Sequence, residues 1–86
     1  MTFEIIRHIA TLSTYRDTNG DKWAKELNIV SWDGRACTFD IRDWKKDHTV
    51  CRLGIKLSAD EMRKLAKGYQ AFNTSVVQEL GGIKNE

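Results

Sequence analysis

Alternating hydrophobic and polar positions divide the chain into four expected strands followed by one helix. Residues 3–14 are rich in Ile and Thr and carry apolar side chains at both parities, which suits a strand covered on both faces. Residues 23–32 and 36–44 alternate on either side of Asp33-Gly34, and residues 51–57 alternate again with a basic outer row. Residues 15–22 are expected to form a turn centred on Asn19-Gly20. The pattern predicts a β-β-β-β-α chain of the α+β class.

The register of the hairpin around Asp33-Gly34 decides which side chains share a face. A two-residue loop would mix polar and apolar side chains on both faces. A three-residue loop, Asp33 to Arg35, separates them, because a slip of one residue moves every side chain to the opposite face. The expected pairs are Ile29 with Phe39, Leu27 with Ile41 and Ser31 with Cys37 on one face, and Glu26 with Arg42, Asn28 with Asp40 and Val30 with Thr38 on the other. We expect the first face to be buried and Glu26 to form a cross-strand ion pair with Arg42 on the second.

Two tryptophans fall on the expected polar face. Trp32 and Trp44 share the parity of Arg42, so all three side chains point the same way if the strands run straight. An exposed Trp on a polar sheet face needs an explanation, and stacking against unpaired bases is one. The alternative is that both rings fold back over the core at the ends of the hairpin. The pattern alone leaves both interpretations open.

A capping box predicts where the helix begins. Ser58 and Glu61 have the spacing at which each side chain caps the backbone N–H of the other, so a helix is expected to start here. One apolar stripe follows, made of Met62, Leu65, Tyr69, Phe72 and Val76. Residues 73–75 are expected to break or bend the helix, which resumes around Val77 and Leu80. The stripe suits either cover for the chain's own sheet or a dimer contact.

Composition limits the function classes. The chain has 86 residues with 41% hydrophobic and 30% charged side chains, which suits one globular domain. Its formal net charge is only +2, so a nucleic-acid site must come from local arrangement. The absence of Pro leaves sheet edges without one common guard, which is consistent with burial in an oligomer. No segment reaches membrane-spanning length and Arg7 and His8 interrupt the N-terminal apolar run, so a cytoplasmic protein is expected.

The residues that usually carry chemistry are sparse. Cys37 and Cys51 are expected to be small core residues, and neither a disulfide framework nor a metal site is expected. His8 and His48 lack a surrounding Cys or acidic cluster, so no metal and no general base is expected there. The turn at residues 17–21 does not fit a calcium loop, because position twelve would be Asn28. The expectation is a protein that is not an enzyme and uses no cofactor.

Four sequence blocks resemble the positive-cofactor-four transcriptional coactivator family, in its compact bacterial YdbC-like branch. The blocks are KELNIVSW, TFDIRDW, the loop KKDH and LGIKLSADE, and the resemblance covers residues 3 to about 72. It implies a homodimer with a strongly curved four-stranded antiparallel sheet in each subunit, helices at the dimer interface, and single-stranded DNA lying over the sheets. A single domain of residues 1–86 is implied, with a C-terminal extension from about residue 73.

The resemblance also implies roles for individual residues. Family members stack bases on aromatic side chains at positions matched here by Trp32 and Trp44. Basic contacts to the DNA backbone map onto Lys25, Arg42 and Arg52. Lys45 and Lys46 would form a solvated loop in most proteins, but their place next to Trp44 makes them further expected phosphate contacts. The implied dimer contacts are Met62, Leu65, Tyr69 and Phe72. Leu53 and Ile29 stand where the family often has basic residues, so weaker binding is expected.

The function expected from these observations is sequence-tolerant binding of single-stranded DNA in transcription regulation or genome maintenance, with nucleoid association in a bacterial cytoplasm. Two alternatives remain open at this point. One is an RNA-binding protein that uses the same sheet, and the other is a module that recruits transcription or replication proteins.

Overall fold

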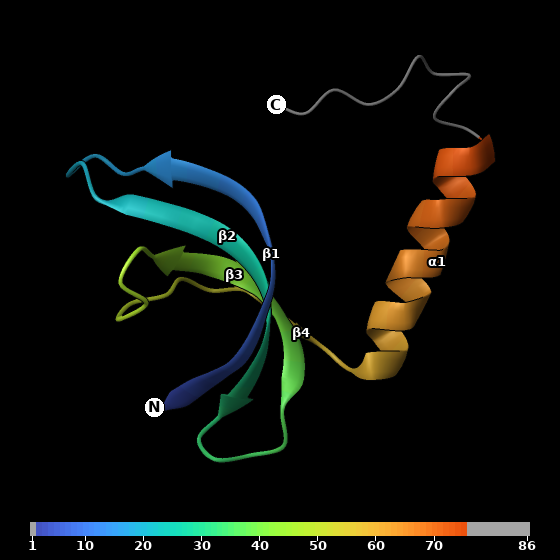
Figure 1. The fold of residues 1–86 in the computed structure, drawn as a ribbon, viewed down its shortest axis with the longest axis horizontal. Helices are drawn as coiled ribbons and strands as arrows, with labels where there is room; N and C mark the ends of the chain where they lie inside the picture. The colour runs from blue at the N-terminus through green and yellow to red at the C-terminus, as the bar shows by residue number, and fades with distance from the viewer. Residues whose placement is uncertain (1, 76–86) are drawn as a thin grey trace.

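The computed structural model describes residues 2–75 and contains four strands and one helix. The elements are β1 (Phe3–Arg16), β2 (Lys22–Trp32), β3 (Thr38–Lys45), β4 (Ile55–Leu57) and α1 (Ala59–Ser75). The strands form one antiparallel sheet in the order β1-β2-β3-β4, with α1 set apart at one side (Figure 1). The predicted α+β class and element order are confirmed.

The register predicted for β2 and β3 is also confirmed. Ile29 pairs with Phe39 and Glu26 lies opposite Arg42, while the last pair before the loop is Val30 with Thr38. The loop combines two devices. Asp33 and Gly34 both have positive φ, 51° and 73°, and Arg35 N donates to Trp32 O at 2.9 Å, which closes a two-residue primed turn. One extra residue on the β3 side of that turn then sets the register. Cys37 lies in this segment and is exposed, so its expected place in the core is wrong.

Strand β1 is an edge strand that pairs irregularly with β2. Its register shifts three times, and the residues left out of the pairing are Ile6, Ile9 and Leu12. Each shift acts as a β-bulge, which bends the bulged strand and increases its twist. The strand consequently curves around its neighbours (Figure 1). Most of β1 is exposed, so the expected cover on both of its faces is wrong within one chain.

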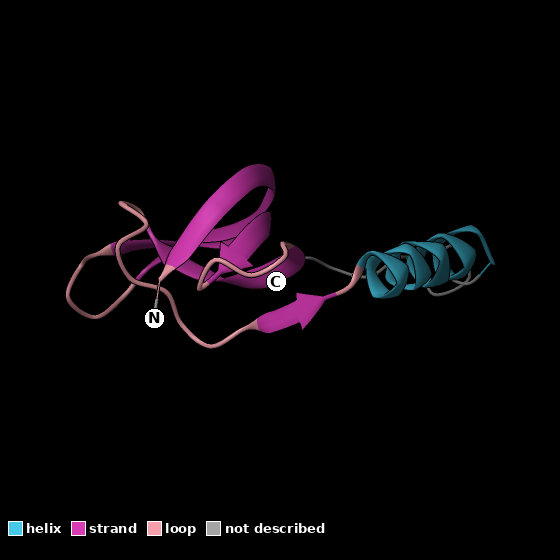
Figure 2. Ribbon diagram, turned by 90° about the horizontal axis from the view of Figure 1, so that it is seen from below, coloured by secondary structure: helices cyan, strands magenta, loops and turns pink. Residues whose placement is uncertain are grey.

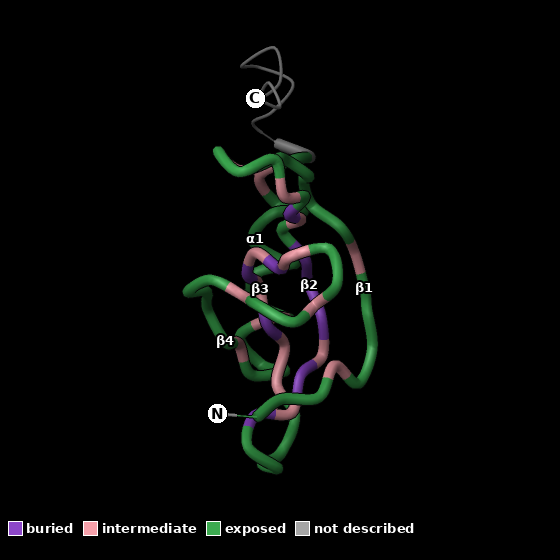
Figure 3. The backbone as a smooth tube through the Cα atoms, turned by 90° about the vertical axis from the view of Figure 1, so that its left-hand side faces the viewer, coloured by how far each residue is buried: buried purple, intermediate pink, exposed green. Residues whose placement is uncertain are grey.

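The buried residues lie mainly on β2 and β3 (Figure 3). Val30, Trp32 and Trp44 form the core cluster, and Ile5 and Cys51 pack against it. We call the face that carries Val30, Trp32, Arg42 and Trp44 the aromatic face. The sequence pattern predicted this face to be solvent-exposed, and that prediction is wrong. Its polar residues are buried as well: Glu26, Asn28, Asp40 and Arg42.

The fourth strand is shorter than predicted. Only Ile55–Leu57 pairs with β3, and Cys51 forms an isolated bridge with Trp44. Between them the backbone passes so close to β3 that a Cβ atom on Gly54 would lie 2.3 Å from both Ile41 O and Arg42 Cβ. Leu53, just before this crossing, is 99% exposed, so its expected inward orientation is wrong.

Helix α1 begins at the predicted capping box. Ser58 Oγ accepts from Glu61 N at 3.0 Å, and Glu61 Oε1 accepts from Ser58 N at 2.8 Å. The helix continues through Ser75 without the expected break. Residues 76–86, where the apolar pattern was expected to resume, lie outside the described residues. Among the described residues no helix is both long and apolar enough to cross a membrane.

The helix stands away from most of the sheet. Figure 2 shows α1 beside the strands instead of over them, and it meets only β3 and β4. The radius of gyration is 15.2 Å, against about 12 Å for a compact domain of this length. Leu65 is 51% exposed and Tyr69 is 64% exposed. Within the described residues, the apolar stripe of α1 therefore does not cover the chain's own sheet at Leu65 and Tyr69.

Candidate nucleic-acid interface

Three aromatic rings form a cluster on the aromatic face. Trp32 and Trp44 are nearly parallel, with ring centroids 6.2 Å apart and planes 13° apart. Phe3 tilts against both, with centroid distances of 5.9 Å to Trp32 and 4.9 Å to Trp44. Trp32 is 4% exposed and Trp44 is 0% exposed. The alternative in which both tryptophans cap the core matches this geometry, and neither ring face is free in the unbound chain.

Two cations lie over Trp32. The Arg42 Cζ is 4.4 Å from the ring centroid and the Lys56 Nζ is 5.2 Å from it. Lys56 is exposed and pairs with Asp40 across β3 and β4, which places it on the aromatic face. Sequence reasoning placed Lys56 in a basic outer row but did not assign it to the site. Its even parity, shared with Gly54, combined with the pairing of Lys56 with Asp40, would have found it.

Arg42 is held by a carboxylate on its own strand. Its Nε donates to Asp40 Oδ1 and its Nη2 to Asp40 Oδ2, both at 2.7 Å. The predicted ion pair with Glu26 is wrong, although the two residues lie opposite each other. Burial alone would lower the pKa of Arg42, but the hydrogen bond and charge of Asp40 raise it above its ordinary value. The guanidinium is thus a fixed, buried cation beneath the surface, not a free contact for the DNA backbone.

Two buried indole N–H groups have no hydrogen-bond acceptor among the described residues. They are Nε1 of Trp32 and Nε1 of Trp44. In contrast, Trp23 Nε1 donates to Asp17 Oδ2 at 2.8 Å, and this hydrogen bond lowers the pKa of Asp17. A buried donor without an acceptor costs about 1–3 kcal/mol. A ligand that brings an acceptor atom to the aromatic cluster would remove this cost.

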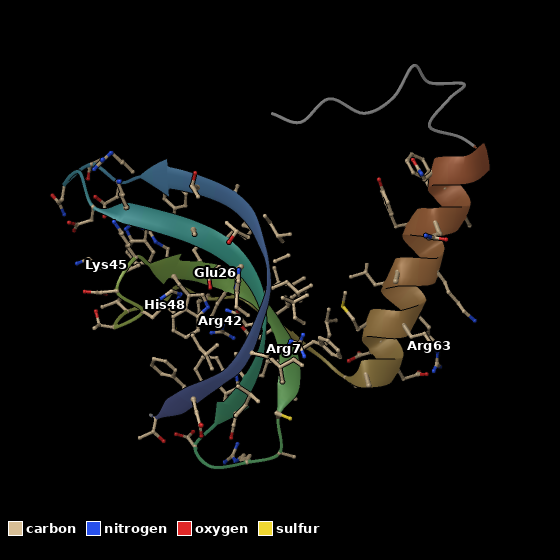
Figure 4. All side chains as sticks on the ribbon, viewed as in Figure 1. Arg7, Glu26, Arg42, Lys45, His48 and Arg63 are labelled. Carbon is tan, nitrogen blue, oxygen red and sulfur yellow. The ribbon has the colours of Figure 1, made fainter. Side chains whose placement is uncertain are left out.

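Glu26 lies at the centre of a polar network next to the aromatic cluster (Figure 4). It accepts from His48 Nε2 at 3.1 Å and from Asn28 Nδ2 at 3.0 Å, and His8 Nδ1 is 3.6 Å away. The His48 ring is 5.7 Å from that of Trp44. Among the described residues no group of three or more His, Cys, Asp or Glu side chains could hold a metal ion. These hydrogen bonds hold the Glu26, Asn28 and His48 side chains in place next to the aromatic cluster.

Two of the implied DNA contacts lie elsewhere. Lys25 pairs with Asp43, and because side chains alternate along a strand it points away from the aromatic face. Arg52 lies over the rings of Trp23, at 4.3 Å, and Tyr15, at 5.9 Å. Lys25 and Arg52 are therefore not brought together with Trp32 and Trp44. The odd parity of Lys25 already separates it in the sequence. Arg52 is separated because its neighbour Cys51 bridges to Trp44 and packs on the aromatic face, and this isolated bridge is not visible in the sequence pattern.

The two lysines after Trp44 differ in their surroundings. Lys45 is half-buried and its Nζ lies 3.4 Å from Asp21 Oδ2. Lys46 is exposed and has no ion pair among the described residues. Of these two expected phosphate contacts, Lys46 is the uncompensated one.

Comparison with known proteins gives a relative but no activity. No protein-family model matches the chain. A protein of Treponema pallidum (strain Nichols), described only as an uncharacterized protein, is 37% identical over 60 residues. The match covers 70% of this chain and 66% of that protein, just under two thirds of its length. The similarity extends over most of the described fold.

Proposed function

We propose that this chain is a homodimeric, sequence-tolerant single-stranded DNA-binding protein of the positive-cofactor-four type. The observation that carries the proposal is the arrangement around Trp32. The Trp32 ring lies under the exposed Lys56, and the indole N–H groups of Trp32 and Trp44 lack acceptors among the described residues. Unpaired bases supply both a flat ring to stack and carbonyl acceptors for N–H groups.

The burial of the rings changes the mechanism expected from sequence. Trp44 lies beneath Trp32 and Phe3 and serves as support. Two cations lie over Trp32: the exposed Lys56 ammonium at 5.2 Å and the Arg42 guanidinium, which Asp40 holds in place, at 4.4 Å. A base that stacks on Trp32 takes the place of the Lys56 ammonium, which then neutralises a neighbouring phosphate. Lys56 thus exchanges its cation–π contact with Trp32 for a phosphate contact, and the base takes its place, so the Trp32 ring stays covered in both states.

Single strands are preferred because their bases are free to stack. Duplex bases already stack on each other, and the net charge of +2 gives little general attraction for duplex DNA. The binding energy must then come mainly from the aromatic face. RNA offers the same bases and phosphates, so an oligo-U arm belongs in every binding experiment.

Replacing Lys56 with Gln should weaken oligo-dT binding and make it less dependent on salt. One lost phosphate contact reduces the slope of log K against log salt by about 0.7 for a single strand. The measurement is a fluorescence-anisotropy titration at several salt concentrations, with Lys67→Gln on the exposed side of α1 as the charge-matched control. Tryptophan quenching is recorded in parallel and should largely disappear in Trp32→Phe. An unchanged salt slope in Lys56→Gln, or quenching that persists in Trp32→Phe, would contradict the exchange mechanism.

The proposed dimer rests on two apolar surfaces that one chain leaves apart. The stripe on α1 is exposed at Leu65 and Tyr69, while the bulged residues of β1 are exposed at Ile6, Ile9 and Leu12. Helix α1 does not reach β1 within the chain. A second copy that covers these surfaces would remove both from water and complete the core.

Leu65→Glu is expected to convert the protein from a dimer to a monomer. A charge placed in an apolar contact loses its hydration without gaining a partner. Sedimentation equilibrium measures the result against the chain mass of 9.9 kDa. Lys67→Glu, which adds the same carboxylate two residues away, should remain dimeric. A wild-type protein that sediments as a monomer at all accessible concentrations would refute the dimer.

A further inference from the structure

A hollow lined by basic residues lies at the end of the sheet remote from Trp32. Its volume is ≈ 460 Å³, and it lies where the turn between β1 and β2 meets the segment that follows β3. Lys46 N donates to Lys22 O at 2.9 Å, which ties the two segments together. We call it the basic hollow, and its lining residues are Arg16, Gly20, Asp21, Lys22, Lys45, Lys46 and Asp47.

Its charges do not cancel. Four cations and two carboxylates line the hollow, a local excess of two positive charges (4 − 2 = 2). Lys45 is paired with Asp21 at 3.4 Å. Asp47 accepts from Thr49 Oγ1 at 2.7 Å and Thr49 N at 3.0 Å, and these hydrogen bonds lower its pKa and keep it charged. The excess equals the formal net charge of the whole chain, +2.

Three of the cations are available to a ligand. Lys22 and Lys46 are exposed and take part in no ion pair among the described residues. Arg16 Nη1 donates to Gly20 O at 2.8 Å, which orients the guanidinium, and its other donors have no partner among the described residues. Arginine and lysine side chains converging from two segments form a site for an anion with several oxygens, such as a phosphodiester.

The basic hollow is continuous with the aromatic face. A second hollow of ≈ 530 Å³ shares Arg16, Lys22 and Lys46 with it and extends to Glu26 and His48. His48 in turn lies against Trp44. Among the residues that line this second hollow Glu26 is the one carboxylate, and its charge is partly screened by the hydrogen bonds from His48 and Asn28. The second hollow and the contact between His48 and Trp44 therefore connect the basic hollow with the aromatic cluster.

We infer that the basic hollow binds the phosphate backbone of a nucleic-acid strand at a distance from the aromatic cluster, through Arg16, Lys22 and Lys46. This inference deepens the proposed function and rests on it. Lys22 and Trp32 mark the two ends of β2, ten residues apart, so the route is at most about 33 Å long. At the ~3.4 Å spacing of stacked nucleotides that is about ten nucleotides. A short strand can occupy the aromatic cluster alone, whereas a longer one reaches both sites.

The test compares oligo-dT of about five and about twelve nucleotides, lengths chosen from this ~33 Å route. The variant is Arg16→Gln/Lys22→Gln, and the control is Lys64→Gln/Lys67→Gln, which removes the same charge from α1. Wild-type protein and control should bind the longer strand more tightly than the shorter one. The variant should lose that gain, and its salt slope for the longer strand should be shallower by about 1.4, two phosphate contacts at about 0.7 each.

Each outcome separates the two proposals. If the variant binds the shorter strand as the wild type does and only the length-dependent gain disappears, the basic hollow is supported. If the variant keeps the full gain, the basic hollow is overturned while the proposed function stands. If wild-type protein binds neither strand at low salt, both are overturned. Equal losses in variant and control would show general electrostatics and would likewise overturn the site.

Discussion

Gly54→Ala should lower the free energy of unfolding by about 3 kcal/mol, because the new methyl group has nowhere to go. Its Cβ would lie 2.3 Å from the carbonyl oxygen of Ile41, a backbone atom, and 2.3 Å from Arg42 Cβ. Neither neighbour can rotate away, so the segment before β4 must shift. That shift would pull Lys56 and Cys51 from their places on the aromatic face. We expect a fall in melting temperature of roughly 12–24 °C, taking about 4–8 °C per kcal/mol for a domain of this size.

Gly68→Ala provides the matched control for this substitution. A Cβ atom at Gly68 meets nothing within 4 Å, and the residue lies inside α1. Alanine should stabilise the helix by about 1 kcal/mol relative to glycine. Thermal unfolding followed by circular dichroism measures both variants. Similar melting temperatures for Gly54→Ala and wild type would show that the close crossing of β3 is absent in solution.

Trp44→Ala should destabilise the protein by about 3–5 kcal/mol, the usual cost of truncating a large buried aromatic side chain. Trp44 is 0% exposed and touches the rings of Phe3, Trp32 and His48. This loss is a large share of the total stability of a small domain, about 5–15 kcal/mol. Urea denaturation monitored by circular dichroism measures the change.

Trp44→Phe refines this prediction because it keeps a ring but removes the unpartnered N–H. Part of the lost packing should be offset by the removal of a donor that costs about 1–3 kcal/mol when buried without an acceptor. Trp23→Phe is the comparison, since it breaks the hydrogen bond to Asp17 and gains no such offset. A Trp44→Ala protein that unfolds like the wild type but no longer binds oligo-dT would instead mean that Trp44 is an exposed platform, which is one of the two interpretations that the sequence pattern left open.

The hairpin shows how far sequence reasoning reaches. The pairing of β2 with β3 was predictable because alternation has a period of two and only one register separates polar from apolar side chains. Parity states which residues share a face, but not which face is covered. The cover on the aromatic face comes from Phe3 and Ile5 at the start of β1 and from His48 and Cys51 after β3. The contacts of Phe3 and Ile5 are distant in sequence, and His48 and Cys51 lie outside the regular strands, so none of them leaves a periodic signal.

The candidate site was partly predictable for the same reason. The grouping of Trp32, Trp44 and Arg42 follows from parity and is present in the fold. The partner of Arg42 was mistaken because Asp40, two residues away on the same face, competes with Glu26 for the guanidinium. Arg16 and Lys22 were missed because they flank a turn, whose position over Lys46 depends on how far the sheet curves.

The three bulges of β1 limit edge-to-edge pairing of this sheet with strands of other chains. An edge strand with regular spacing offers an unbroken row of N–H and C=O groups to any passing strand. Here the row is interrupted at Ile6, Ile9 and Leu12, so a straight foreign strand can match it for only two to four residues at a time. Deleting one of these residues would leave the neighbouring pairs with β2 on their present faces while straightening the edge. We expect the shortened chain to fold, but the edge of β1 would then offer a longer regular row of backbone groups on which fibrils can grow.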